Sequence, residues 1–160
     1  MKLLLLSDIH IPVYLKSLPK CLVEIAKEVD AVIGLGDYVD LNTVLELRAI
    51  SKNFYGVHGN MDEIDVKESL PQVLTVHLGS FDVGLCHGWG PPYQIRERIL
   101  KLFEEKPRVI FYGHTHFIDD SELDGVRFIN PGSFGENGSV AIVEICDHEL
   151  TVSFRKLPIA

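Results

Sequence analysis

Two histidines that follow a short apolar run are the first residues in this chain whose type and spacing suggest chemistry. His114 and His116 come just after residues 109–112, an apolar run typical of a buried strand. Within a strand, a spacing of two would send the imidazoles to opposite faces, but in a loop both can turn toward one point. Two surface histidines could produce the same pair by chance. The pair indicates a ligand site only if other strands also end in potential ligands.

Four further apolar segments do end in residues that can bind a metal. Residues 3–6, 31–35, 53–57 and 81–86 are each typical of a buried strand, and a potential ligand follows each one. Together the five strand ends carry Asp8, His10, Asp37, Asn60, His87, His114 and His116. Any one of these residues alone is more often a turn residue or an ordinary polar side chain. The set gains weight if the fold brings the strand ends together.

The order of the predicted elements does bring the first three ends together. Strands at 3–6, 31–35 and 53–57 alternate with two segments of helical periodicity, and Asp40 or Asn42 is expected to cap the second. Such alternation implies parallel strands joined by right-handed crossovers. Parallel strands end at the same edge of a sheet, where open α/β sheets place ligands. Any other explanation would need five coincidences, so the sequence predicts a metal site.

The second half of the chain changes to short strands around turn signals such as Gly79-Ser80, Asp124-Gly125 and Asp147-His148. The strands expected there are residues 73–78, 81–86, 109–112, 118–123, 126–129, 140–145 and 150–154. One helix, opened by Pro91-Pro92, interrupts them. The sequence therefore predicts an α/β fold, a four-layer α-β-β-α sandwich of two mixed β-sheets flanked by helices. We expect a single domain over residues 1–160.

The candidate ligands restrict both the metal and the reaction. Four histidines, two aspartates and one asparagine, without a thiolate, suit Mn, Fe, Co, Ni or Zn at a higher coordination number. Seven side chains exceed the needs of one ion, whereas two ions that share a carboxylate would use them all. Two ions roughly 3.5–4 Å apart are the usual arrangement for hydrolysis of phosphoryl esters.

The net charge and composition exclude some classes of binding partner. The net charge of −8 and the pI near 5.3 argue against non-specific binding to DNA, RNA or anionic membranes. No apolar stretch approaches the ~20 residues that span a bilayer. Three widely spaced cysteines without a C-x-x-C motif are typical of a reduced intracellular protein. We expect a cytoplasmic protein with no long nucleic acid and no membrane as partner. The oligomeric state stays open, with a homo-oligomer as one option.

Read as a series, the motifs resemble those of a known family. Asp8-x-His10, Gly36-Asp37-x-x-Asp40, Gly59-Asn60, His87-Gly88 and Gly113-His114-x-His116 resemble the motif series of the calcineurin-like metallophosphoesterases. The chain length and the turn at residues 129–133 resemble the small single-domain branch, which contains bacterial and archaeal phosphodiesterases. The resemblance runs from residue 5 to about 135. It implies a two-sheet sandwich flanked by helices, in agreement with the pattern above.

The resemblance also implies a role for each ligand. The implied ligands of the first ion are Asp8, His10, Asp37 and His116. Those of the second are Asn60, His87, His114 and the bridging Asp37. The implied cofactors are two divalent ions per chain, with Mn preferred and Ni, Fe, Co or Zn as alternatives. A metal-bridging hydroxide would attack phosphorus in line, and the residues assigned to catalysis are Asp37, Asn60 and His87.

One position departs from the family pattern. Many members follow the asparagine with a histidine that protonates the leaving group, whereas this chain has Met61, which cannot donate a proton. Asp62 and His58 could substitute as general acids, and either could equally be a turn or surface residue. The departure favours diesters or activated esters, whose leaving groups need less protonation. Asn60 and Trp89 are the candidate substrate-binding residues; Trp89 could stack on a base or simply pack.

The resemblance therefore implies a metal-dependent phosphodiesterase that acts on a small phosphodiester. The first alternative is a protein-binding scaffold, because the small retromer coat subunit has this fold and this chain's residues 10–12 and 18–19 resemble its N-terminal loop. A scaffold has no reason to keep all seven ligands, which favours the enzyme. The second alternative is a phosphomonoesterase or protein phosphatase, which Met61 and the absence of extra loops disfavour.

Overall fold

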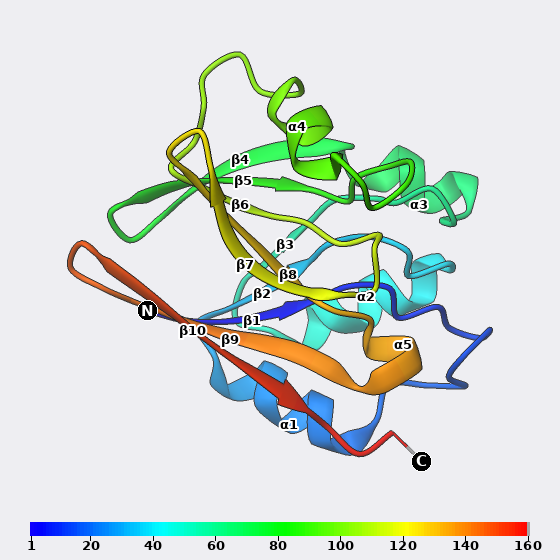
Figure 1. The fold of residues 1–160 in the computed structure, drawn as a ribbon. Helices are drawn as coiled ribbons and strands as arrows, with labels where there is room; N and C mark the ends of the chain where they lie inside the picture. Colours follow the sequence, from blue (N-terminus) through cyan, green and yellow to red (C-terminus); the bar gives the residue numbers. More distant parts are fainter. Residues whose placement is uncertain (160) are drawn as a thin grey trace.

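Two five-stranded sheets form the body of the computed structural model, which describes residues 1–159 (Figure 1). The first sheet contains β1 (Lys2–Leu6), β2 (Ala31–Gly34), β3 (Phe54–Gly56), β9 (Ser139–Cys146) and β10 (Glu149–Lys156), in the order β10-β9-β1-β2-β3. The second contains β4 (Val73–Leu78), β5 (Phe81–Cys86), β6 (Val109–Phe111), β7 (Ile118–Leu123) and β8 (Val126–Pro131), in the order β4-β5-β6-β8-β7. Both sheets mix parallel and antiparallel pairs.

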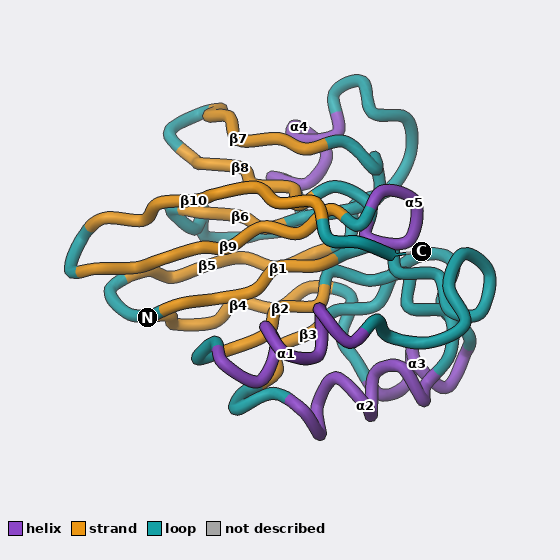
Figure 2. The backbone as a smooth tube through the Cα atoms, turned by 90° about the horizontal axis from the view of Figure 1, so that it is seen from below, coloured by secondary structure: helices purple, strands orange, loops and turns teal. Residues whose placement is uncertain are grey.

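Helices lie outside both sheets and complete the four layers (Figures 1 and 2). The helices are α1 (Lys20–Glu28), α2 (Leu41–Ile50), α3 (Ile64–Ser69), α4 (Ile95–Leu100) and α5 (Phe134–Asn137). Apolar side chains of α1, α2 and α3 share one cluster on the outer face of the first sheet, and α4 packs on the second sheet. The predicted fold class is therefore confirmed. No helix in the part of the chain that the structure describes is long and apolar enough to span a membrane.

The apolar run at the N-terminus packs on both faces of the first sheet. Leu3 and Leu5 point into the cluster between the sheets, whereas Leu4 and Leu6 point into the cluster under α1 and α2. All four side chains have no exposed surface. A central strand that is buried on both faces needs apolar residues at every position, which explains the unbroken run.

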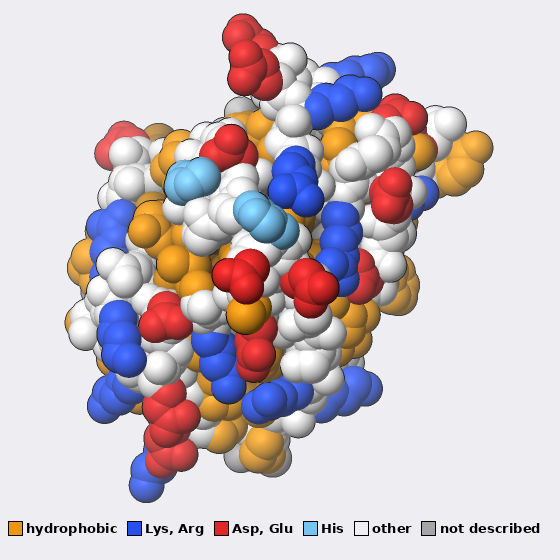
Figure 3. All heavy atoms as spheres, turned by 90° about the vertical axis from the view of Figure 1, so that its left-hand side faces the viewer, with side chains coloured by type: hydrophobic (Ala, Val, Ile, Leu, Met, Phe, Trp, Pro, Cys, Tyr) orange, Lys and Arg blue, Asp and Glu red, His pale blue; other side chains and the backbone are white. Residues whose placement is uncertain are grey.

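The strands that precede the candidate ligands run in parallel within each sheet. β1 pairs with β2 and β2 with β3 in parallel, and in the second sheet β5 pairs with β6 in the same way. The carboxyl ends of these strands, and the loops that follow them, therefore collect at one edge of the sandwich. The opposite end, with several hairpin turns, faces the viewer in Figure 3, where acidic and basic side chains are interspersed.

Several boundaries differ from those expected, and two short helices were not predicted. β8 continues to Pro131 instead of ending at 129. α4 ends at Leu100, although Phe103 beyond its end still packs in the same apolar cluster. α3 and α5 contain six and four residues, too few to show a helical repeat of apolar positions. The expected cap was right, because the Asp40 side chain accepts a hydrogen bond of 2.9 Å from the backbone N–H of Thr43.

Removing one aromatic ring from between the sheets should test this architecture. Phe111 has no exposed surface and packs in the inter-sheet cluster. We expect Phe111→Ala to lower the free energy of unfolding by about 3–5 kcal/mol, because the cavity it leaves cannot fully close. The measurement is urea denaturation in the presence of a chelator. Phe117→Ala, at a side chain that is 68% exposed, serves as the control. A loss of less than about 1 kcal/mol for Phe111→Ala would contradict close packing of the two sheets.

Candidate metal centre

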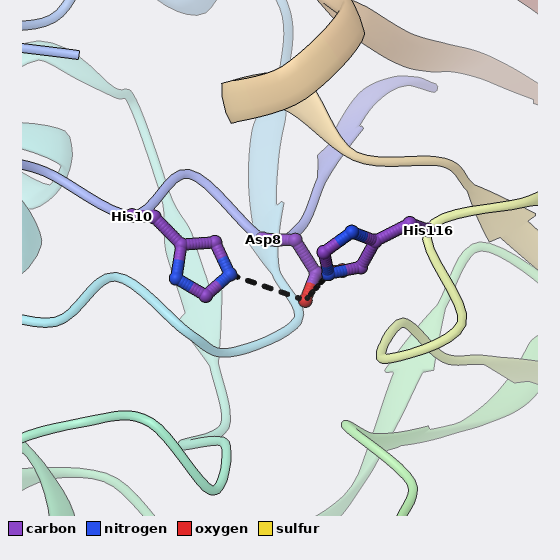
Figure 4. Close-up of side chains that lie close together, drawn as sticks. All are labelled: Asp8, His10 and His116. Carbon is purple, nitrogen blue, oxygen red and sulfur yellow. Dashed lines mark ion pairs between the residues drawn. The ribbon is translucent and has the colours of Figure 1, made fainter. Parts of the chain in front are cut away.

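A buried aspartate lies at the middle of the candidate ligands. Asp8 Oδ1 is 3.4 Å from Nε2 of His116 and 3.7 Å from Nε2 of His87. The same oxygen is 3.8 Å from Nε2 of His10. Figure 4 shows His10 and His116 turned toward Asp8 from two different loops. Loops that follow β1, β5 and β6 thus direct three imidazoles at one carboxylate.

Asp37 adds a second carboxylate to the cluster. Its Oδ2 is 3.1 Å from Nε2 of His87 and 3.7 Å from Nε2 of His10. Two triads can each surround an ion, because their ligand atoms lie within 4.8 Å of one another: Asp8, His10 and His116, and Asp8, Asp37 and His87. The residue common to both triads is Asp8, whereas the family resemblance assigns the bridge to Asp37. Which carboxylate bridges stays a prediction.

Unpartnered atoms show that these residues fit a cation. Asp8 Oδ1, His10 Nε2 and His87 Nε2 are buried and accept or donate no hydrogen bond. Leaving a buried polar atom unpaired costs about 1–3 kcal/mol, so three at one point call for a ligand.

The tautomer of His87 sharpens this conclusion. Its Nδ1 lies 2.6 Å from the carbonyl oxygen of Leu35, which can only accept, so Nδ1 carries the proton. In the neutral ring, the lone pair of Nε2 then faces the carboxylate of Asp37. A lone pair and a carboxylate in contact repel each other unless a positive charge lies between them. A proton on Nε2 supplies that charge in the metal-free protein, and a divalent ion can take its place.

The electrostatics of the ionisable groups agree. Burial would raise the pKa of Asp8, but the surrounding histidines hold it well below its ordinary value. Burial would lower the pKa of His87, but the Asp37 and Asp8 carboxylates raise it to about 9. The two shifts are two sides of one attraction, because the imidazoles favour the charged carboxylate and the carboxylates favour the charged imidazole. The carboxylates thus favour a positive charge at the centre of the site.

Glu136 supports a ligand and was missed by sequence reasoning. Its Oε1 lies 3.0 Å from Nδ1 of His116, so Nδ1 carries a proton and Nε2, which faces Asp8, is the ring atom available to a metal. The Asp8 carboxylate raises the pKa of His116 to about 9, with help from Glu136 and against the effect of burial. A carboxylate behind a ligating histidine is a common device for orienting the ring.

His114 and Asn60 lie beside the triads and not within them. Nε2 of His114 is 2.9 Å from the carbonyl oxygen of Gly90, which leaves Nδ1 as the ring atom available to a metal. The His114 and His87 rings are 5.2 Å apart between centroids. Asn60 is exposed in the loop after β3. Their predicted roles as ligands of a second ion stay predictions.

The two candidate general acids occupy different environments. Both oxygens of Asp62 accept from backbone N–H groups, those of Asp37, Val39 and Gly59, at 2.7–3.0 Å. Burial raises the pKa of Asp62, although these N–H donors work against that shift. Such a carboxylate holds two loops together, which favours a structural role over proton donation. His58 is half-buried with a free Nδ1, and burial lowers its pKa.

Met61 contributes to the centre through its backbone. Its N–H donates a hydrogen bond of 2.9 Å to Oδ1 of Asp37, while its side chain is 58% exposed. The glycine two residues earlier has no room for a side chain, because a Cβ on Gly59 would collide with the carboxylate of Asp37. The segment therefore approaches Asp37 closely enough to fix it.

Backbone strain marks the same loops. Asp8, His10, Asp37, His114 and His116 have φ of 56°, 53°, 58°, 71° and 67°. Non-glycine residues in this left-handed region cost of order 1–3 kcal/mol each and persist where surrounding contacts determine them. Here the contacts are backbone hydrogen bonds between neighbouring loops, such as those from Asp8 N to the Gly36 oxygen and from His10 N to the Asp37 oxygen, both 3.0 Å.

Two residues of the predicted turn at 129–133 hold the histidine and aspartate loops. Asn130 is fully buried and donates from Nδ2 to the Gly113 oxygen at 3.0 Å and to Thr115 Oγ1 at 3.1 Å. Ser133 donates from Oγ to the backbone carbonyl oxygen of Asp8 at 3.2 Å. The sequence indicated a turn here, but the burial that shows these roles depends on the fold.

With this fold and this centre in place, the chain can be assigned to a family. The family model for the calcineurin-like phosphoesterase superfamily domain matches residues 1–148. The chain belongs to that superfamily. The family assignment inferred from the motif series is confirmed.

Individual relatives span enzymes and a sorting protein. A Thermotoga maritima protein solved by NMR is 51% identical, with a TM-score of 0.83 over 98% of this chain and 99% of its own. A probable metallophosphoesterase of Methanothermobacter thermautotrophicus is 31% identical, covering 80% of this chain and 74% of its own. A Methanocaldococcus jannaschii protein named as a phosphodiesterase is 28% identical, covering 82% and 83%. Vps29 of Entamoeba histolytica is 26% identical, with a TM-score of 0.76 over 96% and 91%.

Neutralising Glu136 should weaken metal binding without removing a ligand. Glu136→Gln keeps the size of the side chain but loses the charge that orients His116, so we expect Mn²⁺ to bind about 10- to 100-fold more weakly at the site it helps to form. Isothermal titration calorimetry gives the affinity. Glu149→Gln, at an exposed position on β10, is the matched control. An unchanged affinity in Glu136→Gln would show that Glu136 does not support the His116 ligand.

Proposed function

We propose that this protein is a metal-dependent phosphodiesterase that hydrolyses small phosphodiesters at a dinuclear centre. The observation that carries the proposal is the buried, unpartnered Asp8 Oδ1 with imidazole nitrogens of His10, His87 and His116 directed at it. Membership of the phosphoesterase superfamily and a relative named as a phosphodiesterase support the reaction class.

The division of labour in this proposal is the one that the family resemblance implies. When bound, two divalent ions generate a hydroxide nucleophile from water and neutralise charge on the phosphoryl group. In this proposal Asp8, His10 and His116 hold one ion, His87, His114 and Asn60 hold the other, and Asp37 bridges the two. Mn²⁺ is the preferred metal on ligand type, with Ni, Fe, Co or Zn as alternatives. Asn60 is exposed beside the centre, where its amide can bind a phosphate oxygen.

The surroundings of the centre favour small diesters. Met61 offers no proton to a leaving group, and both oxygens of Asp62 are occupied by backbone N–H groups. The net charge of −8 supplies no field that would hold a long polyanion, so long nucleic acids are poor substrates. Free Cys21, Cys86 and Cys146 suit a reducing compartment, and we propose a cytoplasmic location.

One observation supports a second candidate function, a protein-binding scaffold. Apolar side chains of Val13, Tyr14, Ile64 and Phe117 are between 46% and 75% exposed on the loops and short helix around the ligand edge. Vps29 proteins share this fold. A scaffold of this kind needs neither bound metal nor turnover, so metal content and diesterase activity discriminate between the two candidates.

Counting ions in variants tests the dinuclear centre. We expect two Mn²⁺ per chain in the wild type, close to none in Asp37→Ala, and a weakened single site in His10→Ala, because Asp37 is proposed to touch both ions. Equilibrium dialysis followed by elemental analysis gives the count. If Asp8→Ala loses both ions and Asp37→Ala only one, then Asp8 is the bridge. At most one ion per chain in the wild type at saturating Mn²⁺ would falsify the dinuclear proposal.

A leaving-group series tests the proposed role of position 61. Met61→His places an imidazole where related enzymes carry one, and the exposed position and similar volume make the change tolerable. We expect kcat/KM to rise selectively for alkyl esters and monoesters, by up to roughly the 10²–10⁴ that a positioned acid contributes. Nitrophenyl diesters should gain little. Equal dependence on leaving-group pKa in both proteins would show that another group, such as His58, already donates the proton.

A further inference from the structure

A cavity of about 280 Å³ opens directly beside the metal centre. His87 and Asn60 belong to both, so a molecule in the cavity lies next to the Asp37 triad. The other side chains used below are His58, Lys67, Gln72, Cys86, Trp89 and Leu102, all of which line it. The hydrolytic chemistry described above gives no role to Lys67, Gln72, Cys86, Trp89 or Leu102.

Part of the cavity lining is apolar and includes a flat aromatic side chain. Trp89 is 40% exposed, Leu102 is half-buried and Cys86 is buried. An exposed indole beside apolar neighbours offers a face on which another ring can stack. Simple packing would instead bury the indole, so its exposure favours a ligand.

The rest of the lining offers hydrogen-bonding groups without negative charge. His58 Nδ1 is buried and has no hydrogen-bond partner, and the amide of Gln72 can both donate and accept. Among the described residues that line the cavity, Lys67 is the only lysine, arginine, aspartate or glutamate. The lining thus suits a ring with donors and acceptors at its edge that is attached to an anionic group.

The loop that carries Trp89 is held in place by one arginine. Arg98 donates from Nε to the Trp89 oxygen at 3.1 Å and from Nη1 to the Tyr93 oxygen at 2.8 Å. Gly90, on the same loop, accepts the hydrogen bond from His114. The indole wall is therefore tied both to α4 and to a predicted metal ligand, which keeps the distance between cavity and centre constant.

We propose that this cavity binds the base of a nucleotide phosphodiester, with Trp89 as the stacking surface and the phosphate at the metal centre. The volume lies just below the roughly 300–1,000 Å³ of typical small-molecule sites, which suits a single base with its sugar. The inference rests on the proposed phosphodiesterase function and names its substrate class: esters of single nucleotides, in preference to diesters without a base.

The single tryptophan of the chain makes occupancy measurable without turnover. We expect AMP to quench the fluorescence of Trp89 to saturation, and ribose 5-phosphate, which lacks only the base, to have little effect. The titration is run with Mn²⁺ and again with a chelator. Equal responses to the two compounds would overturn the proposal.

Variants then test the stacking surface by calorimetry on the Mn²⁺-loaded protein. Stacking on one base is worth about 5- to 140-fold in affinity, so the preference for AMP over ribose 5-phosphate should fall by that factor in Trp89→Ala. Trp89→Phe should keep most of the preference. Tyr93→Ala, an exposed aromatic side chain of the same loop that does not line the cavity, should keep all of it. A preference that survives in Trp89→Ala, or falls as far in Trp89→Phe, would overturn the proposal.

Turnover separates this proposal from the diesterase function. Thymidine 5′-(4-nitrophenyl) phosphate and methyl 4-nitrophenyl phosphate share a leaving group and differ in the base-bearing side. We expect a higher kcat/KM for the thymidine ester, with the ratio reduced in Trp89→Ala. Turnover of both esters at equal efficiency would contradict the base site alone. No turnover of either, with the AMP preference intact, would contradict the diesterase function and leave the base site standing.

Discussion

A carboxylate buried among imidazole nitrogens is the interaction on which the rest of the structure depends. Asp8 has no exposed surface, yet its Oδ1 forms no hydrogen bond and faces nitrogens from three loops. Left alone, such an arrangement is unfavourable, because desolvation and unpaired acceptors both oppose it. Its energetic cost has to be met by the surrounding fold and by the cation for which the site is shaped.

The fold meets that cost with hydrogen bonds that join the backbones of neighbouring loops, directly or through side chains. Loops that leave neighbouring parallel strands continue to pair beyond the sheet, and Asp62 joins two of them through three N–H groups. Asn130 and Ser133, at and just after the end of β8 in the second sheet, hydrogen-bond to the loops that carry His114 and Asp8. Because these contacts join five chain segments, the ligand positions depend on the whole sandwich and on no single element.

How far the site could be predicted from sequence depended on whether its signals were local. Apolar runs that end in ligands are local, so the strands and the loops bearing Asp8, Asp37 and His116 could be recognised in order. Glu136 supports His116 across a gap of 20 positions in the sequence, on a helix of four residues that shows no periodicity. Nothing near Glu136 in the chain distinguishes it from an exposed acid. Its role becomes visible only in the folded protein, where the chain after β8 passes beside the loop that carries His116.

For Asp62 the local signal was present but ambiguous. An aspartate two positions after a candidate ligand is compatible with proton donation, with a turn and with a surface position. The distinction depends on which N–H groups converge on it, and these come from the loop after β2 as well as its own. Tertiary contacts decide the role of such a residue, and a pattern in one segment does not contain them.

The backbone and the side chain at position 61 have separate roles. The backbone N–H of Met61 fixes Asp37, while the side chain projects into solvent and takes part in no contact that holds the loops. A substitution of this side chain can add or remove a proton donor without disturbing the hydrogen bonds that hold the loops. In the proposed mechanism, substrate range can therefore change at this position while the loops that hold the ligands stay as they are.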